Sequence, residues 1–262
     1  MRRLRSAAKG FGAVLIPPLV TFGIIAGIHL AGRHDNAATT PSPAASGGPS
    51  AAAAQASCPW RISLIGTAAA PEVQARSAPS TSARIVGTFS RHNVQGNPQV
   101  FLLLNATTVH KSTWFQALLP VRPNGTMGYI RGSDLTLSRT PYHVTVSKGA
   151  RRLTLWSGCH AVRTYPVAIG TKTTPTPTGL FYLASLVRPP TADSVYGTYA
   201  FGLSGYSPVI RNWKWGGVIG LHGTNDPSSI GHYTSHGCIR LHNRDIDKLV
   251  RILPLGTPIA IS

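Results

Sequence analysis

Acidic side chains are scarce in this sequence. Its 262 residues hold 7 Asp and Glu against 25 Lys and Arg, which gives a formal net charge of +18 at pH 7. Such an excess favours an anionic neighbour, which is a nucleic acid, an anionic lipid or an acidic polymer. The basic residues are scattered along the chain, and the sequence has no helix-turn-helix, zinc-finger or aromatic-rich RNA-binding motif. We therefore expect no nucleic-acid partner.

One long apolar segment lies near the N-terminus. Residues 1–12 carry four basic side chains, and residues 13–31 are almost wholly apolar. A basic start followed by such a run is an export signal. The run is long enough to span a bilayer and no small-x-small cleavage site follows it, so we expect residues 1–33 to anchor the chain, with the basic end inside and the remainder outside. The alternative is a cleaved signal peptide.

Cysteine is also rare, and the three cysteines are Cys58, Cys159 and Cys238. If Cys238 stays free, the other two form the only remaining pair, and an exported chain sits where disulfides persist. The alternative is two inert thiols. A zinc site is disfavoured, because the spacing of Cys238 and the histidines near it, among them His232, matches no standard zinc pattern. We expect neither a metal nor another cofactor.

The middle of the chain divides into a tether and a small β-rich region. Residues 34–57 are mostly Ala, Pro, Ser, Thr and Gly, a composition typical of a flexible linker. Residues 58–138 hold a turn signal and four strand-like segments. These segments are residues 84–89, 100–104, 114–119 and 127–130. Short strands with a tryptophan and a Gly-Tyr-Ile end resemble a bacterial SH3-like barrel.

Residues 139–262 show a clearer β pattern. We expect strands at 142–147, 152–156, 162–169, 180–187, 217–221 and 258–261. The proline-rich stretch 174–179 cannot be an interior strand, because proline lacks the ladder donor. Residues 188–213 are predicted to be a long loop that acts as a lid or substrate wall. Asn243 is predicted to cap a short helix.

Histidines and glycines gather around the third cysteine. A buried strand is expected to end at His222, and a polar loop then returns the chain to Cys238. A free cysteine has a pKa near 8.5, so only about 3% is thiolate at neutral pH, and a nucleophilic cysteine needs a base. His222 comes from a separate strand, whereas His236 is two residues from the cysteine. The N–H groups of Gly237 and Cys238 are natural oxyanion donors.

The group that orients the base is less clear from the residues alone. No acidic side chain lies next to either histidine in the sequence; Asp226 is the nearest and Asp245 is also within reach. A backbone carbonyl, such as that of Gly223, is the alternative. The stretch therefore has the parts of a cysteine acyl-transfer site, namely a nucleophile, a base, an orienting group and oxyanion donors.

Two motifs together resemble the catalytic domain of the bacterial L,D-transpeptidases (YkuD type). They are Leu221-His222-Gly223-Thr224 and Ser235-His236-Gly237-Cys238-Ile239-Arg240. The stretches 174–179 and 225–230 are also similar to that family, and the resemblance covers roughly residues 140–262. It implies a mainly β protein in which a β-sandwich-like catalytic domain with one or two short helices follows the small SH3-like module.

The resemblance also implies roles for individual residues. Cys238 is the nucleophile, His222 is its base, and the Gly223 carbonyl holds the base. His236, Gly237 and Cys238 line the oxyanion site. For substrate binding we expect four residues, which are Arg240, Ser235, Thr224 and Tyr196.

The implied reaction is an acyl transfer on peptidoglycan stem peptides. Cys238 attacks the third residue of a tetrapeptide stem and expels D-Ala, and the side-chain amine of a diamino acid on a second stem resolves the thioester to give a 3→3 cross-link. Water as acceptor makes the same site an L,D-carboxypeptidase, and an inactive wall-binding module is a further alternative. We expect acylation by carbapenems and a location in the cell envelope, either anchored to the cytoplasmic membrane facing outward or secreted to the wall. The SH3-like module either binds the wall or only packs.

Overall fold

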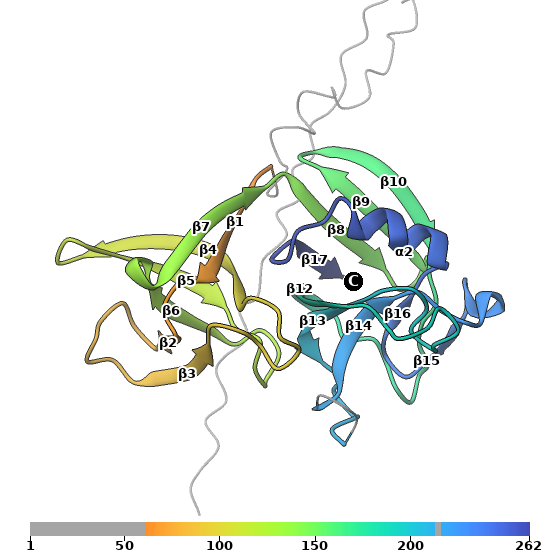
Figure 1. The fold of residues 1–262 in the computed structure, drawn as a ribbon, viewed down its shortest axis with the longest axis horizontal. Helices are drawn as coiled ribbons and strands as arrows, with labels where there is room; N and C mark the ends of the chain where they lie inside the picture. The colour runs from red at the N-terminus through yellow and green to blue at the C-terminus, as the bar shows by residue number, and fades with distance from the viewer. Residues whose placement is uncertain (1–60, 213–215) are drawn as a thin grey trace, which may run out of the picture. The chain divides into compact units, whose positions relative to one another are not determined.

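The computed structural model describes residues 61–212 and 216–262, which belong to one compact unit. The predicted anchor, the linker and Cys58 lie outside the described residues. Within the described ranges, no helix is both long and apolar enough to cross a membrane. The mainly β fold class is confirmed, because two large sheets and a single α-helix account for most of this part of the chain (Figure 1).

The first sheet is antiparallel and has seven strands in the order β3-β2-β6-β5-β4-β1-β7. Its strands are β1 (Ser63–Ala68), β2 (Glu72–Arg76), β3 (Ile85–Ser90), β4 (Val100–Val109), β5 (Ser112–Leu118), β6 (Met127–Arg131) and β7 (Leu135–Thr140). Alternating side chains of the central strands, such as Phe101, Phe115 and Ile130, form its core. The four strands predicted in this region are present, and β1, β2 and β7 were not predicted.

The second sheet has eight strands in the order β10-β9-β8-β17-β12-β13-β14-β16. Its strands are β8 (Tyr142–Ser147), β9 (Arg152–Ser157), β10 (His160–Pro166), β12 (Gly179–Val187), β13 (Ala200–Tyr206), β14 (Val218–His222), β16 (Ile239–Arg240) and β17 (Pro258–Ile261). A short parallel pair, β11 (Ile169–Gly170) with β15 (Tyr233–Ser235), forms a separate two-stranded sheet. It adjoins β16 through a bridge between Ala168 and Arg240. The helix α2 (Asn243–Val250) adds the buried Ile246 and Leu249 to the core of this sheet.

The prediction of one long loop over residues 188–213 was wrong. Strand β13 lies inside that range and pairs with both β12 and β14 in the middle of the second sheet. Two glycines in β13 obscured it, because glycine usually weakens a strand. A Cβ at Gly202 would lie 2.5 Å from Ser185 Oγ, and one at Gly205 would lie 2.4 Å from the Phe181 ring. These glycines therefore let β12 side chains approach the β13 backbone.

Candidate active site

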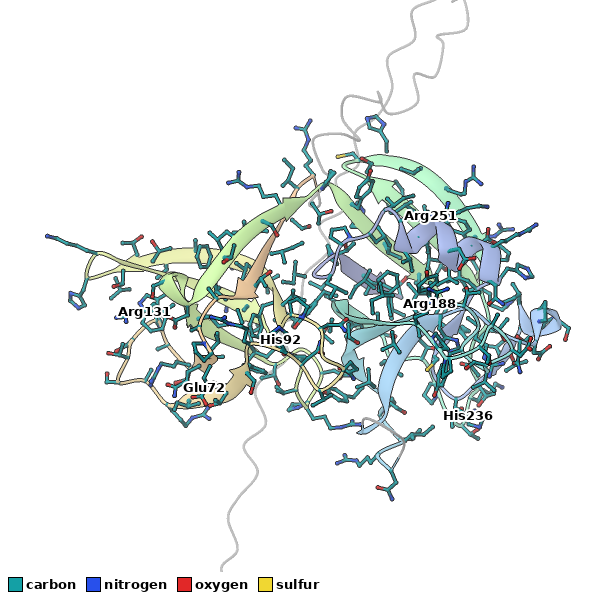
Figure 2. The ribbon with its side chains drawn as sticks, in the orientation of Figure 1. Glu72, His92, Arg131, Arg188, His236 and Arg251 are labelled. Atoms are coloured by element: carbon teal, nitrogen blue, oxygen red, sulfur yellow. The ribbon has the colours of Figure 1, made fainter. Side chains whose placement is uncertain are left out.

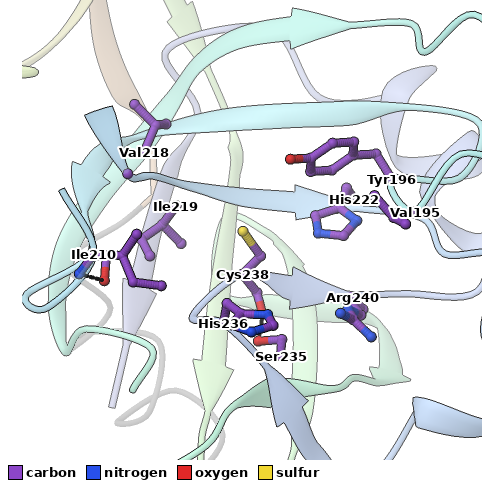
Figure 3. A pocket seen from close by; sticks show the side chains of 12 residues that line it. Val195, Tyr196, Ile210, Val218, Ile219, His222, Ser235, His236, Cys238 and Arg240 are labelled. Carbon is purple, nitrogen blue, oxygen red and sulfur yellow. Dashed lines mark hydrogen bonds between the residues drawn. The ribbon is translucent and has the colours of Figure 1, made fainter. Parts of the chain in front are cut away.

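Parallel pairing of β14 with β16 brings the two sequence motifs together. Leu221 pairs with Ile239, and His222 pairs with Arg240. His222 is the last residue of β14, and Cys238 immediately precedes β16. Figure 3 shows the Cys238 sulfur directed toward β14, the strand that carries His222.

His222 is held in one orientation by the backbone of its neighbour. Its Nδ1 lies 2.5 Å from the carbonyl oxygen of Gly223. A carbonyl only accepts, so Nδ1 carries the proton and donates it to this bond, which leaves Nε2 as an unprotonated acceptor. Burial lowers the pKa of His222 to about 4, and the positive charge of Arg240 acts in the same direction. The imidazole is therefore a neutral base at neutral pH.

Cys238 is a free cysteine whose thiol is largely buried. Burial raises the pKa of the thiol, while the N–H of Gly220 and the positive charge of Arg240 oppose that rise. The Gly220 N–H donates to Sγ at 3.3 Å. Both shifts favour the uncharged forms, so the resting pair is a thiol and a neutral imidazole.

Gly220 lies close to both the His222 imidazole and the Cys238 thiol, and sequence reasoning missed it. A Cβ built on Gly220 would lie 3.1 Å from His222 Cδ2 and 3.5 Å from Cys238 Sγ. The imidazole and the thiol therefore flank the same backbone position, and a side chain there would press against both. A glycine inside a predicted strand is the one signal that pointed to such a close approach.

Two pockets meet at the Cys238–His222 pair. The smaller one is lined by Ser235, His236 and Arg240 among others. The larger one has a volume of about 450 Å³. Tyr196, Val218, His222 and Cys238 line both pockets. His222 and Cys238 accordingly border two separate cavities.

The chain is similar to known proteins over its second half. A family model described as the L,D-transpeptidase catalytic domain, YkuD, matches residues 141–261. The putative L,D-transpeptidase YkuD of Bacillus subtilis is 38% identical over 56% of this chain and 85% of its own length. The Bacillus licheniformis protein of the same name is 36% identical over 56% of this chain and 86% of its own length. The chain belongs to the YkuD family of L,D-transpeptidases.

Solved L,D-transpeptidase structures are also similar to the chain. One from Mycobacterium smegmatis is 15% identical, covers 62% of this chain and 90% of its own, and has a TM-score of 0.39. The C442S mutant of the Enterococcus faecium enzyme is 19% identical, covers 47% of this chain and 50% of its own, and has a TM-score of 0.37.

In this YkuD-family chain, Ser235 builds the turn that carries Cys238. Its side chain is 1% exposed, and its Oγ accepts from the Gly237 N–H at 3.1 Å and donates to the Cys238 carbonyl at 2.5 Å. Gly237 has a φ of +115°, a conformation that favours glycine. The Ser235 hydroxyl is thus used inside the turn, while the residue also borders the smaller pocket. The Gly237 N–H is engaged with it, whereas the Cys238 N–H donates to no other described residue.

The proline-rich stretch 174–179 is a loop, as predicted, and it supports that same turn. Thr176 Oγ1 donates to the Gly237 carbonyl at 2.8 Å and accepts from the Gly170 N–H at 2.9 Å. Thr174 Oγ1 donates to the Ser235 carbonyl at 3.1 Å. Neither threonine was predicted as a site residue, because their partners lie about sixty positions away.

Thr224 and Asn243 hold the other motif. Asn243 does not cap α2 through its side chain, so that prediction was wrong; its Oδ1 accepts from the Thr224 N–H at 2.9 Å instead. The Thr224 hydroxyl accepts from the Asp226 N–H at 3.0 Å, and the residue is buried. A Cβ on Gly223 would lie 2.2 Å from Asn243 Oδ1, so only glycine fits beside this bond. Thr224 therefore fixes the turn after His222.

Tyr196, His236 and Arg240 are the predicted residues that face open space. The Tyr196 ring meets the His222 ring edge-on, with centroids 5.0 Å apart and planes at 72°. His236 is exposed and lines the smaller pocket with Arg240 (Figure 3). Arg240 Nε is buried without a hydrogen-bond partner among the described residues. These three side chains are the ones placed to meet a ligand.

Two further expectations concern cysteine and metal. Cys159 is disulfide-bonded. Its predicted partner, Cys58, lies outside the described residues, so that pairing stays a prediction. In the ranges that the structure describes, no three His, Cys, Asp or Glu side chains form a group that could hold a metal ion.

Proposed function

We propose that this protein is a peptidoglycan L,D-transpeptidase in which Cys238 forms the acyl-enzyme. The observation that carries the proposal is the placement of the thiol and the neutral imidazole close to Gly220, at the junction of two pockets. Membership of the YkuD family points to the same reaction class.

In the first step, the thiol proton moves to His222 Nε2 as Sγ attacks the carbonyl carbon of the third stem residue. The Cys238 N–H is the donor that remains for the oxyanion, since the Gly237 N–H is engaged with Ser235. Collapse of the tetrahedral adduct breaks the peptide bond, and the proton on Nε2 goes to the departing amine of D-Ala. A thioester on Cys238 remains.

In the second step, the side-chain amine of a diamino acid on another stem attacks the thioester. His222 takes the amine proton, and the sulfur leaves and regains a proton from the imidazolium. The product is a 3→3 cross-link. Two pockets at one cysteine suit a reaction with two peptide substrates, because donor and acceptor need separate approaches to the same carbonyl.

Purified protein incubated with a disaccharide-tetrapeptide tests the proposal. A cross-linked dimer together with free D-Ala supports transpeptidation. A tripeptide product without dimer would assign the L,D-carboxypeptidase reaction, in which water is the acceptor, and binding without turnover would assign a wall-binding module. These products are separable by mass spectrometry.

Acylation by a carbapenem tests the nucleophile separately. Cys238→Ala should keep the fold and abolish the adduct mass in an intact-protein spectrum, because no other free thiol is present among the described residues. His236→Ala is the matched variant, since it changes the neighbouring pocket wall and leaves the thiol in place. An adduct on the Cys238→Ala protein would show that another group is acylated.

We also propose a location in the cell envelope. The basic segment and apolar run of residues 1–33 support anchoring with the catalytic part outside the cytoplasmic membrane. The charge of +18 suits a wall rich in carboxylates and phosphates. Fractionation of cells with antibody detection tests this, and recovery in the cytosolic fraction would contradict it.

A further inference from the structure

Part of the wall around Cys238 is attached to the first sheet, which lies outside the region matched by the family model. The wall segment comprises the described residues from the end of β13 to the start of β14, which are residues 206–212 and residues 216 and 217. Ser207, Ile210 and Gly217 of this segment line the smaller pocket together with Cys238. A backbone hydrogen bond joins the two ends of the segment, because the Ser207 N–H donates to the Gly217 carbonyl at 2.8 Å.

Arg122, in the β5–β6 connection of the first sheet, contacts three carbonyls of this wall segment. Its Nη1 donates to the Ser207 carbonyl at 2.9 Å. Its Nη2 donates to the carbonyls of Gly216 at 2.8 Å and Ile210 at 3.3 Å. The guanidinium also lies over the Tyr206 ring, 4.7 Å from its centroid. A planar group with five donors suits this arrangement, because it reaches several acceptors at once.

Neighbouring residues of the same connection fix the start of the segment. Asn124 exchanges two hydrogen bonds with the Tyr206 backbone: its Nδ2 donates to the carbonyl at 2.8 Å, and its Oδ1 accepts from the N–H at 2.9 Å. The Tyr206 hydroxyl donates to the Pro120 carbonyl at 2.8 Å. The segment is thereby tied to the first sheet at both of its ends.

A residue from the region of the first sheet also lines the larger pocket. Gln95 lines it, from the connection between β3 and β4. That connection is docked on β12, because Asn93 Nδ2 donates to the Ala184 carbonyl at 3.1 Å and Asn97 Oδ1 accepts from the Leu186 N–H at 2.5 Å. Each pocket at Cys238 therefore has a wall that depends on the first sheet.

We propose that Arg122 is a positioning residue for the acyl-transfer site, and that the first sheet completes this site. Arg122 holds the Ser207, Ile210 and Gly216 backbone of the wall segment in the conformation that shapes the smaller pocket. It acts on bound peptide through that segment rather than by contact with the reacting atoms. The inference rests on the proposed function in one respect, which is that the pocket beside Cys238 receives a peptide or a carbapenem.

Arg122→Ala in the full-length protein tests the positioning role. We expect the second-order rate of carbapenem acylation to fall by about 10- to 100-fold, because small misplacements of a binding wall cost that much. Alkylation of Cys238 by iodoacetamide should be unchanged, since this small reagent does not need the wall. Arg131→Ala is the matched control: it removes an equal charge from the first sheet, on the side away from His236 (Figure 2), where Arg131 lies over Trp114. It should acylate like the wild type.

The variant Arg122→Lys distinguishes the effect of the three hydrogen bonds to carbonyls from the effect of the positive charge. A lysine keeps the charge but has a single nitrogen, so we expect only partial recovery of the acylation rate. Full recovery with lysine would assign the effect to charge alone and would overturn the proposal. Equal rates for wild type and Arg122→Ala would also overturn it, as would a parallel loss of iodoacetamide reactivity. A wild-type protein that no carbapenem acylates would instead count against the proposed function.

Discussion

At the scale of single residues, burial sets the protonation state of the reacting pair. Burial disfavours the charged form of both side chains: it lowers the pKa of His222 and raises the pKa of Cys238, so each favours its neutral form. A neutral thiol is a weak nucleophile, so in the proposed reaction the imidazole accepts its proton as the carbon–sulfur bond forms. His222 is suited to this, because Gly223 fixes the tautomer with Nε2 free.

Because of this arrangement, we expect the acylation rate to decline only at unusually acidic pH. His222 acts as a base only when neutral, and its pKa of about 4 keeps it neutral at all higher pH values. We expect the carbapenem acylation rate to fall as pH drops through about 4, rather than through the ordinary histidine value of 6.5. The measurement is a pH–rate profile by intact mass.

A stability control belongs with that profile. Between pH 6.5 and about 4 the unfolded chain takes up a proton at His222 and the folded chain does not, so the free energy of unfolding falls as pH is lowered through this range. Circular dichroism at each pH separates unfolding from a true acid limb. A limb between pH 6 and 7 in protein that remains folded would contradict the neutral-pair mechanism.

Gly220 gives a second prediction at this scale. Gly220→Ala should slow acylation by about 100-fold, because the new methyl group would displace the imidazole and the thiol relative to each other. Stability should fall by about 1–3 kcal/mol, the usual cost of overpacking a closely packed position. Backbone strain should add nothing, since Gly220 has no positive φ. Gly149→Ala is the matched control, as a Cβ there meets nothing within 4 Å. Equal rates for the two variants would exclude the spacing role.

The sequence predicted the residues that carry chemistry better than the residues that hold them. Cys238, His222 and Gly223 stand out because rare residue types occur at short spacing in two motifs. Asn243 and Thr176 act through backbone groups of distant segments, and nothing in their own neighbourhood shows which groups these are. Ser235 lies within a motif, yet its orientation into the turn depends on how Gly237 bends the chain.

At the scale of elements, the pairing of β14 with β16 is the step that creates the site. The apolar run before His222 predicted β14, and the return of the chain to Cys238 was expected. Strand β13 was not predicted. Its glycines allow close contacts with β12 side chains, and those contacts exist only in the folded sheet. Sequence patterns thus predicted most strands of the second sheet that alternate regularly, but missed β13, whose small residues fit against a neighbouring strand. In the first sheet they also missed β1, β2 and β7.

The loop of residues 174–179 carries a prediction at this scale. Thr176→Val keeps the side-chain shape but leaves the Gly170 N–H and the Gly237 carbonyl without their partner. Unpaired buried polar groups cost about 1–3 kcal/mol each, so the loss of two partners should lower the free energy of unfolding by about 2–6 kcal/mol. Acylation should slow as well, because the turn before Cys238 loses a support. Urea unfolding measures the first effect.

Thr176→Ser serves as the control for that variant. Serine keeps the hydroxyl that both backbone groups use, so it should retain most of the stability and most of the acylation rate. If the serine and valine variants lost equal amounts, methyl packing rather than hydrogen bonding would be the cause.

At the scale of the whole molecule, the two sheets share a hydrophobic cluster. Ile65, Leu102 and Leu118 of the first sheet pack with Tyr182 of β12 in the second. Gly256, which follows α2, comes so close to Ile65 that a Cβ on it would lie 2.4 Å from Ile65 Cγ2. Together with the hydrogen bonds of Arg122 and Asn124, this contact ties the stability of each sheet to the other.

The shared cluster predicts that both sheets unfold in one transition. Ile65→Ala should lower the free energy of unfolding by about 2–5 kcal/mol, the usual range for a buried isoleucine, and should leave a single calorimetric transition at a lower temperature. Tyr182→Phe is the control at the same contact. It keeps the ring and removes a buried hydroxyl that has no partner among the described residues, so its stability should equal or exceed that of the wild type. Two separated transitions, with only the first sensitive to Ile65→Ala, would show that the sheets are independent. In that case, the acylation activity should be lost on heating at the second transition alone. If the sheets are coupled, acylation activity and the structure of both sheets should be lost at the same temperature.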